Sequence, residues 1–356
     1  MSLRIQDIRT YAGTTLRPTA VEVDRTGVGA DRIAGLANAG LLNHLAPAEF
    51  GGAETDTATD RQIAETLAGA CPNTWLVWTQ HAPQVGRLAA LYRDGVDLPD
   101  TAYEILRGER IAGAALSDVR RYPDRYIRAT RVRGGWRLDG TVSWVSGWGI
   151  STVLTVAAVD PGTGTVVTAL VPVGEGFRPA QLQLAALNGS RTYRVGLEGV
   201  VVADDNVLSR EPMEQWRRRD TGVATDAKPH HFGVAAAVLD ELEREDDPLA
   251  GDIAGQWRPV IASLREEAYA LTDASDAADR VSERLGLKVA ATEALTTLTG
   301  ALLTARAGHG LGLDDTAQLY ARTALFIRVQ GQNAAVRRAQ LTHFTHPHLH
   351  RSEQNR

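Results

Sequence analysis

The spacing of apolar residues changes twice along this chain, and that change limits the possible folds more than any other feature. Between Gly27 and about Arg107 they recur at helical spacing, as in DRIAGLANAGLLNHL. From Ile111 short runs rich in Val, Thr, Tyr and Trp alternate with turn signals such as RGG, DPGTG and LNGS, a pattern typical of an antiparallel sheet. Long, Ala-rich helical patterns then return and persist to about Phe344.

This order predicts an α+β multidomain protein with an N-terminal helical domain, a central antiparallel β domain and a C-terminal four-helix bundle. We place the helical domain at 1–110, the β domain at 111–209, a polar linker at 210–229 and the bundle at 230–344. The His-rich segment 345–356 is predicted to be a disordered tail.

Composition excludes several classes of function. A hydrophobic fraction of 44% over 356 residues can bury a sizeable core, and a net charge of −5 with interspersed signs does not favour nucleic-acid binding. The single cysteine, Cys71, excludes an intrachain disulfide. The N-terminus lacks a signal-peptide pattern, and no apolar run approaches the roughly 18 residues that would span a bilayer. We therefore expect a cytoplasmic protein without nucleic-acid or membrane partners.

Several common catalytic motifs are absent. The chain has no GxxxxGK[ST], HExxH, CxxC or GxSxG sequence, and GVGADR at Gly27 has Arg32 in place of a third glycine. The terminal histidines lie in a segment that we expect to be disordered, so we predict no metal site there. These histidines are His343, His346, His348 and His350.

The stretch GTVSWVSGWG, from Gly140 to Gly149, places two tryptophans around a serine. Alternation along a strand would put Trp144 and Ser146 on one face and Val145 on the other. An indole and a hydroxyl would then lie side by side.

Five segments, in order, carry a resemblance to a known family. GLLNHLAPAEFGG (40–52), GERIAGAALSD (108–118), WRLDGTVSWVSG (136–147), LNGSRTYRVGLEGVVVADDNVL (187–208) and GHGLGLDDTAQLYARTALFIRVQGQ (308–332) resemble motifs of the acyl-CoA dehydrogenases. From the first to the last, they span most of the chain.

The resemblance implies a flavin fold, with FAD as the cofactor, FMN as the alternative, and a homodimer or homotetramer. An indole beside the flat flavin ring stacks on it and excludes water, and a neighbouring hydroxyl can donate to the ring near N5. The residues that the resemblance assigns to cofactor binding are Ser117, Trp144, Ser146, Gln330 and Gly331. The adjacent VRRYPDRY segment adds two extra arginines and lacks the phosphate-contacting serine that the family has there.

The catalytic residue is not identified by the resemblance. Family members remove an α-proton with a carboxylate, but the usual glutamate corresponds here to Gln330, or to Gly331 without a gap. The remaining candidates lie near the start of the bundle; they are Asp220, Asp226, His230 and His231.

Three functions are compatible with these observations. The first is a flavin-dependent oxidoreductase of the acyl-CoA dehydrogenase type, acting on a CH–CH group of an acyl thioester. The second is a flavin-dependent monooxygenase on a small molecule, favoured by the missing glutamate. The third is a scaffold or binding protein that has lost the cofactor.

Overall fold

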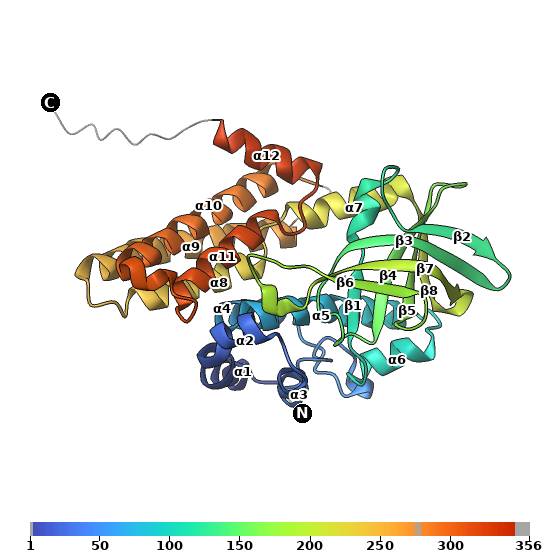
Figure 1. Ribbon diagram of the computed structural model, residues 1–356, viewed down its shortest axis with the longest axis horizontal. Helices are drawn as coiled ribbons and strands as arrows, with labels where there is room; N and C mark the ends of the chain where they lie inside the picture. The colour runs from blue at the N-terminus through green and yellow to red at the C-terminus, as the bar shows by residue number, and fades with distance from the viewer. Residues whose placement is uncertain (1–2, 275, 277–278, 346–356) are drawn as a thin grey trace.

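The computed structural model describes residues 3–274, 276 and 279–345. Helices come first, a sheet follows and helices return, as Figure 1 shows from blue to red. The N-terminal helices are α1 Ile5–Tyr11, α2 Ala20–Thr26, α3 Ala30–Asn38, α4 Thr57–Ala70, α5 Pro72–Arg93 and α6 Asp100–Leu106. The predicted fold class is confirmed.

One eight-stranded sheet forms the middle of the chain. Its strands are β1 Ala112–Ala115, β2 Arg128–Val132, β3 Gly135–Val145, β4 Val153–Asp160, β5 Thr165–Pro172, β6 Phe177–Gln181, β7 Tyr193–Ala203 and β8 Val207–Pro212. They run in the order β6-β7-β3-β2-β4-β5-β8, with β1 paired to β4. The sheet is mixed rather than wholly antiparallel, because β1 and β2 each pair in parallel with β4. The long connection after β1 allows its parallel pairing.

The C-terminal helices are α7 Met213–Thr225, α8 Pro229–Leu242, α9 Pro248–Ala274, α10 Val281–Arg306, α11 Thr316–Val329 and α12 Ala334–Phe344. The segment 210–229, predicted as a linker, therefore contains a helix. Buried Met213 and Trp216 pack against β4 and β5. This tertiary contact stabilises a helix that the polar sequence of the segment did not predict. The predicted tail lies outside the described residues, apart from Thr345.

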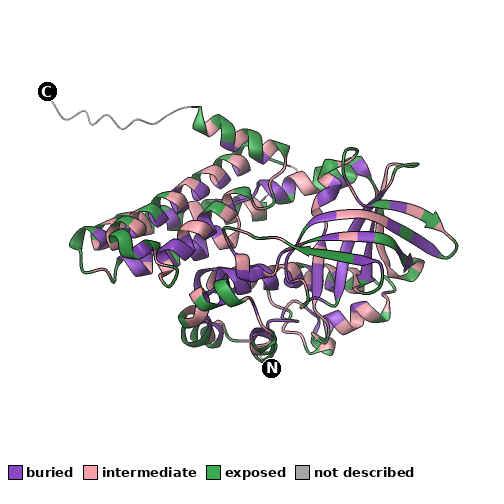
Figure 2. Cartoon of the chain, viewed as in Figure 1, coloured by how far each residue is buried: buried purple, intermediate pink, exposed green. Residues whose placement is uncertain are grey.

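The N-terminal helices hold the other two parts together. Helices α5 and α6 pack on β1, β4 and β5 through an apolar cluster that includes Leu88, Ile105 and Leu170. On the bundle side, α4 crosses α8 at Gly69 and Gly233, where a Cβ on Gly233 would lie 2.1 Å from the Glu65 carbonyl oxygen. Figure 2 shows buried positions continuing through these contacts. The three parts thus share closely packed interfaces.

Candidate functional site

A cavity of about 640 Å³ lies where the sheet, α5 and the turn between α11 and α12 meet. Its size is within the range of small-molecule sites. The cavity brings together all five residues assigned to cofactor binding by resemblance, from segments far apart in the sequence: Ser117, Trp144, Ser146, Gln330 and Gly331. Cofactor binding by these residues stays a prediction.

Trp144 is 45% exposed although the residues on either side of it are buried. A β-bulge accounts for this, because between Val142 and Val145 three steps along β3 match two along β7. Bulges re-aim side chains and are common beside functional sites. The bulge therefore leaves the Trp144 indole at the wall of the cavity.

Asp118 holds the bulged strand. It lies in the short 3₁₀ helix Ser117–Arg121, and its carboxylate accepts the Ser143 backbone N–H at 2.6 Å and the Ser143 hydroxyl at 2.7 Å. The Asp118 side chain is buried and lines the cavity. The extra residue at a bulge has no hydrogen-bond partner on the neighbouring strand. The Asp118 carboxylate supplies such a partner for Ser143, the residue immediately before Trp144. Asp118 was matched to a family motif from sequence but was not among the predicted site residues.

Ser146 begins a chain of three buried hydroxyl groups. Its Oγ lies 2.8 Å from Thr192 Oγ1, which lies 2.8 Å from Ser190 Oγ. Each hydroxyl can donate or accept, so the chain can reverse its direction without moving heavy atoms. Ser146 can therefore present either a proton or a lone pair to a ligand in the cavity.

The turn between α11 and α12 closes another side of the cavity. Gly331 adopts φ +62, a conformation that favours glycine. Gln340 supports the turn by donating to the Arg328 carbonyl at 2.7 Å and accepting from Gln332 at 2.8 Å. The buried Gln330 Oε1 has no hydrogen-bond partner within the described part of the chain, an uncommon condition for a buried polar atom. The hydrogen-bonding capacity of this amide oxygen is therefore unused within the described residues.

Three arginines line the cavity together with one carboxylate, that of Asp118. Arg120 is neutralised, because its guanidinium donates two 2.8 Å hydrogen bonds to Asp220. Arg121 and Arg337 have no carboxylate within 4.0 Å among residues 3–274, 276 and 279–345. The cavity is thus more positive than the chain as a whole.

The four candidate catalytic residues are not among those lining the cavity. Asp220 pairs with Arg120, and buried Asp226 pairs with Arg284 and Lys228. The His230 ring is tilted against Trp75, with ring centroids 4.6 Å apart, and stacks on His231, with ring centroids 4.5 Å apart.

Burial keeps both histidines neutral at physiological pH. It lowers the pKa of His231 to about 3 and that of His230 well below its usual value. Burial also lowers the pKa of nearby Lys288 to about 7. A general base at pH 7 needs a pKa near that value and access to the substrate, and neither imidazole meets both conditions.

His81, on α5, is a structural residue. Its Nε2 lies 2.7 Å from the Leu42 carbonyl, and its Nδ1 accepts the Ala112 N–H at 3.0 Å. The imidazole therefore joins the loop after α3 to β1, as an Nε2–H tautomer. Burial lowers the pKa of His81 to about 4.

We expect the free energy of unfolding to fall as pH drops from about 6.5 toward 4. The unfolded chain binds a proton at His81 over this range, whereas the folded protein does not. At about 1.4 kcal/mol per pKa unit, this group contributes about 3 kcal/mol above pH 6.5, which is lost near pH 4. Urea unfolding at pH 7 and pH 5 measures the loss. The His81→Gln variant should be less stable at pH 7 but less sensitive to pH; parallel curves for the two proteins would contradict this assignment.

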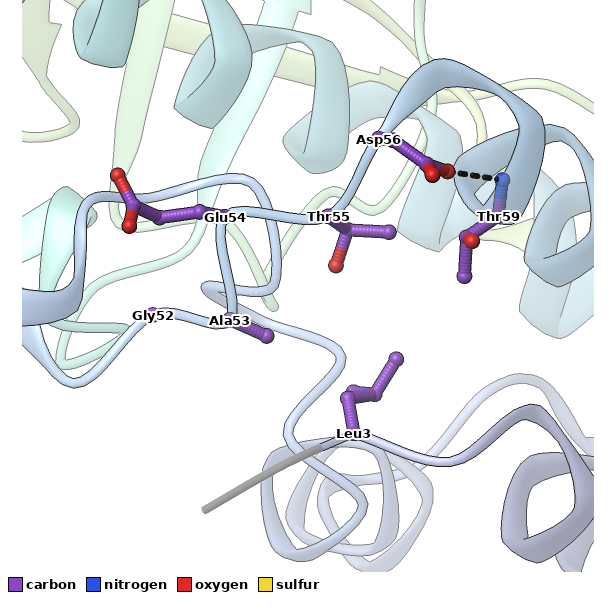
Figure 3. Close-up of a pocket in the computed structure, with 7 residues that line it drawn as sticks. All are labelled: Leu3, Gly52, Ala53, Glu54, Thr55, Asp56 and Thr59. Atoms are coloured by element: carbon purple, nitrogen blue, oxygen red, sulfur yellow. Dashed lines mark hydrogen bonds between the residues drawn. The ribbon is translucent and has the colours of Figure 1, made fainter.

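A second cavity, of about 480 Å³, lies on the N-terminal domain (Figure 3). Asp56 there caps α4 by accepting the Thr59 N–H, and Glu54 pairs with Arg93 at 3.5 Å. The predicted site residues are not among those lining it. Its two carboxylates already have protein partners, so the larger cavity is the better candidate site.

Within the described residues, no helix combines the length and the apolar composition needed to cross a membrane. The same residues contain no cluster of three or more His, Cys, Asp or Glu that could hold a metal ion. Of the four terminal histidines only His343 belongs to the described residues.

Comparisons with known proteins match the N-terminal domain and the whole fold. Residues 4–96 match the family model of the acyl-CoA dehydrogenase N-terminal domain. A curated relative, 3-sulfinopropanoyl-CoA desulfinase of Paraburkholderia xenovorans (strain LB400), is 23% identical over 94% of this chain and 93% of its own length.

Two solved structures share the fold over almost the whole chain. Butyryl-CoA dehydrogenase of Megasphaera elsdenii superposes with a TM-score of 0.77 at 14% identity, covering 96% of this chain and 98% of its own. Dibenzothiophene monooxygenase of Paenibacillus sp. A11-2 superposes with a TM-score of 0.76 at 20% identity, covering 96% and 97%. It is also known with FMN bound, and that structure gives the same TM-score.

Proposed function

The chain has the acyl-CoA dehydrogenase fold with an N-terminal domain that matches that family, and on this premise we propose that it is a flavin-dependent oxidoreductase acting on an acyl thioester. The observation that carries the proposal is the 640 Å³ cavity, which gathers the five residues assigned to flavin binding. Its unpartnered polar atom and half-exposed indole are features that a bound ring would satisfy.

Three groups fit the flavin ring. The Trp144 indole offers a flat apolar face, and the Ser146 hydroxyl can donate because Thr192 and Ser190 can reorient with it. The Gln330 amide oxygen can accept from a ring N–H. A bound flavin would supply hydride or oxygen chemistry. FAD is the proposed cofactor, with FMN as the alternative.

The substrate class rests on two independent supports. The matched desulfinase and butyryl-CoA dehydrogenase are both named for CoA thioesters. The cavity also carries two arginines without a carboxylate partner in the described chain, and these suit the anionic groups of such a molecule.

The choice of reaction depends on the missing base. Removal of an α-proton, as action on a CH–CH group requires, needs an available general base, which is a carboxylate in the family that the chain resembles. Among the described residues, Asp118 is the one carboxylate that lines the cavity, and it already accepts two hydrogen bonds from Ser143. Gln330 stands where the family glutamate is expected. This arrangement favours a second candidate, a flavin-dependent monooxygenase, because oxygenation does not need that carboxylate.

Absorption spectroscopy of the purified protein tests the proposal. A yellow protein, or one that binds FAD or FMN on addition, is expected, whereas a colourless protein that binds neither would support the scaffold hypothesis. Anaerobic bleaching by acyl-CoA would establish dehydrogenation. Oxygen consumption that needs a flavin reductase, without such bleaching, would establish oxygenation.

Trp144→Ala should weaken flavin binding about tenfold, since aromatic stacking contributes about 1 to 1.5 kcal/mol. Trp144→Phe retains an aromatic face and should recover most of the affinity. Flavin fluorescence quenching gives both dissociation constants. Equal affinity in the wild type and Trp144→Ala would leave Trp144 a surface tryptophan without a flavin contact.

We also propose a homodimer or homotetramer in the cytoplasm. Large apolar side chains more than half exposed on α11 and α12 support self-association: Leu325, Val329, Leu341 and Phe344. Light scattering would test the oligomeric state.

A further inference from the structure

We propose that Arg121 and Arg337 bind a phosphate group together in the large cavity. The inference rests on the proposed function, because the phosphate belongs either to the flavin or to the coenzyme part of the thioester. Arg121 ends the 3₁₀ helix Ser117–Arg121, and Arg337 lies in the first turns of α12, so two separate elements present a guanidinium to one cavity.

The carboxylates near this pair are already engaged. Asp220 binds Arg120 through two hydrogen bonds. Asp118 accepts both donors of Ser143 and lies 3.8 Å from Arg125. Within the described residues, no carboxylate lies within 4.0 Å of Arg121 or Arg337. Both arginines are exposed, so their guanidinium groups are accessible to a bound anion.

The surroundings add to the positive potential. Arg217 of α7 donates to the Tyr122 carbonyl at 3.1 Å, beside Arg121. The first turn of α12 begins at Asn333, whose side chain caps the Val336 N–H at 2.9 Å, and the N-terminal end of a helix carries a partial positive charge. Arginine suits this role because its planar fork binds two phosphate oxygens at once.

Other residues that line the cavity have a different chemistry. Trp144 offers an aromatic face, and Ser146 and Gln330 offer neutral hydrogen-bonding groups. The cavity is therefore lined for a molecule with a flat neutral part and an anionic part. Both FMN and FAD have this form, and a CoA thioester also carries phosphates, so the experiment must separate the two sources.

The test compares ligands with and without the phosphate. Binding of FMN, riboflavin and coenzyme A to the full-length apoprotein is measured by calorimetry for the wild type and the Arg121→Gln/Arg337→Gln double variant. If the pair holds the flavin phosphate, the wild type should prefer FMN over riboflavin about tenfold or more, and the double variant should lose that preference with riboflavin affinity unchanged. If the pair holds the coenzyme phosphate, the double variant should instead bind coenzyme A about tenfold more weakly.

Arg338→Gln is the matched control, because Arg338 is the next residue of α12, is exposed and does not line the cavity. It should change none of the three affinities. The inference is overturned if the double variant retains both the FMN preference and the coenzyme A affinity of the wild type. Failure of the proposed function is a separate outcome, in which the wild type binds neither riboflavin nor FMN; the coenzyme A measurement still tests the arginine pair in that case.

Discussion

Asp118→Ala is expected to lower the free energy of unfolding by about 3 kcal/mol and to reduce flavin binding more than any single change on the ring side. The substitution leaves the Ser143 N–H and hydroxyl without their acceptor in a buried position, and each orphaned donor costs about 1 to 3 kcal/mol. The bulge that aims Trp144 at the cavity would then lose its support. Urea unfolding and flavin titration measure the two effects.

Asp124→Ala provides the control, since Asp124 lies in the same loop and is exposed. It should leave stability within about 0.5 kcal/mol of the wild type. A double-mutant cycle of Asp118→Asn with Ser143→Ala isolates the contribution of the hydroxyl contact. Wild-type flavin affinity in Asp118→Ala would show that Trp144 does not depend on this carboxylate.

Gly233→Ala should destabilise the protein by about 3 kcal/mol, because its Cβ has no space at the crossing of α4 and α8. That atom would lie 2.1 Å from the Glu65 carbonyl oxygen and 2.6 Å from Glu65 Cα. Both contacts are with backbone, so one helix must shift, and such overpacking costs about 1 to 3 kcal/mol or more. The midpoint of thermal or urea unfolding measures the loss.

The matched control for this prediction is Gly255→Ala on α9. An added Cβ there meets nothing within 4 Å, so alanine should stabilise the helix by about 0.5 to 1 kcal/mol. Opposite signs for the two glycines are the expected result. Equal effects would show that the α4–α8 crossing is looser than its backbone contacts indicate.

The resemblance to the acyl-CoA dehydrogenases is confirmed for the N-terminal domain and the fold. Alternation along β3 placed Trp144 and Ser146 at one site, and both line the cavity. The bulge between Val142 and Val145 could not be predicted. It depends on Asp118, which precedes Ser143 by 25 residues and meets it only in the folded chain.

The candidate base shows the limit of local inference. His230 and His231 follow Pro229 at the start of α8, a position that suggested the mouth of the site. In the structure His231 is buried, and His230 is half-buried against Trp75 and His231. Conversely, Arg337 was not predicted. Its position seven residues after Gln330, one helical turn beyond the Asn333 cap, is the signal that could have indicated it.

The sequence by itself determined the order of helices, sheet and helices, because apolar spacing depends on residues a few positions apart. It also indicated the aromatic and hydroxyl groups of the candidate ring site. Only the tertiary structure decided which charges near the cavity are neutralised. Asp220 reaches Arg120 across 100 residues of chain, while Arg121 lines the cavity with Arg337. Such pairings follow from how the three parts pack, which no local pattern of residues specifies.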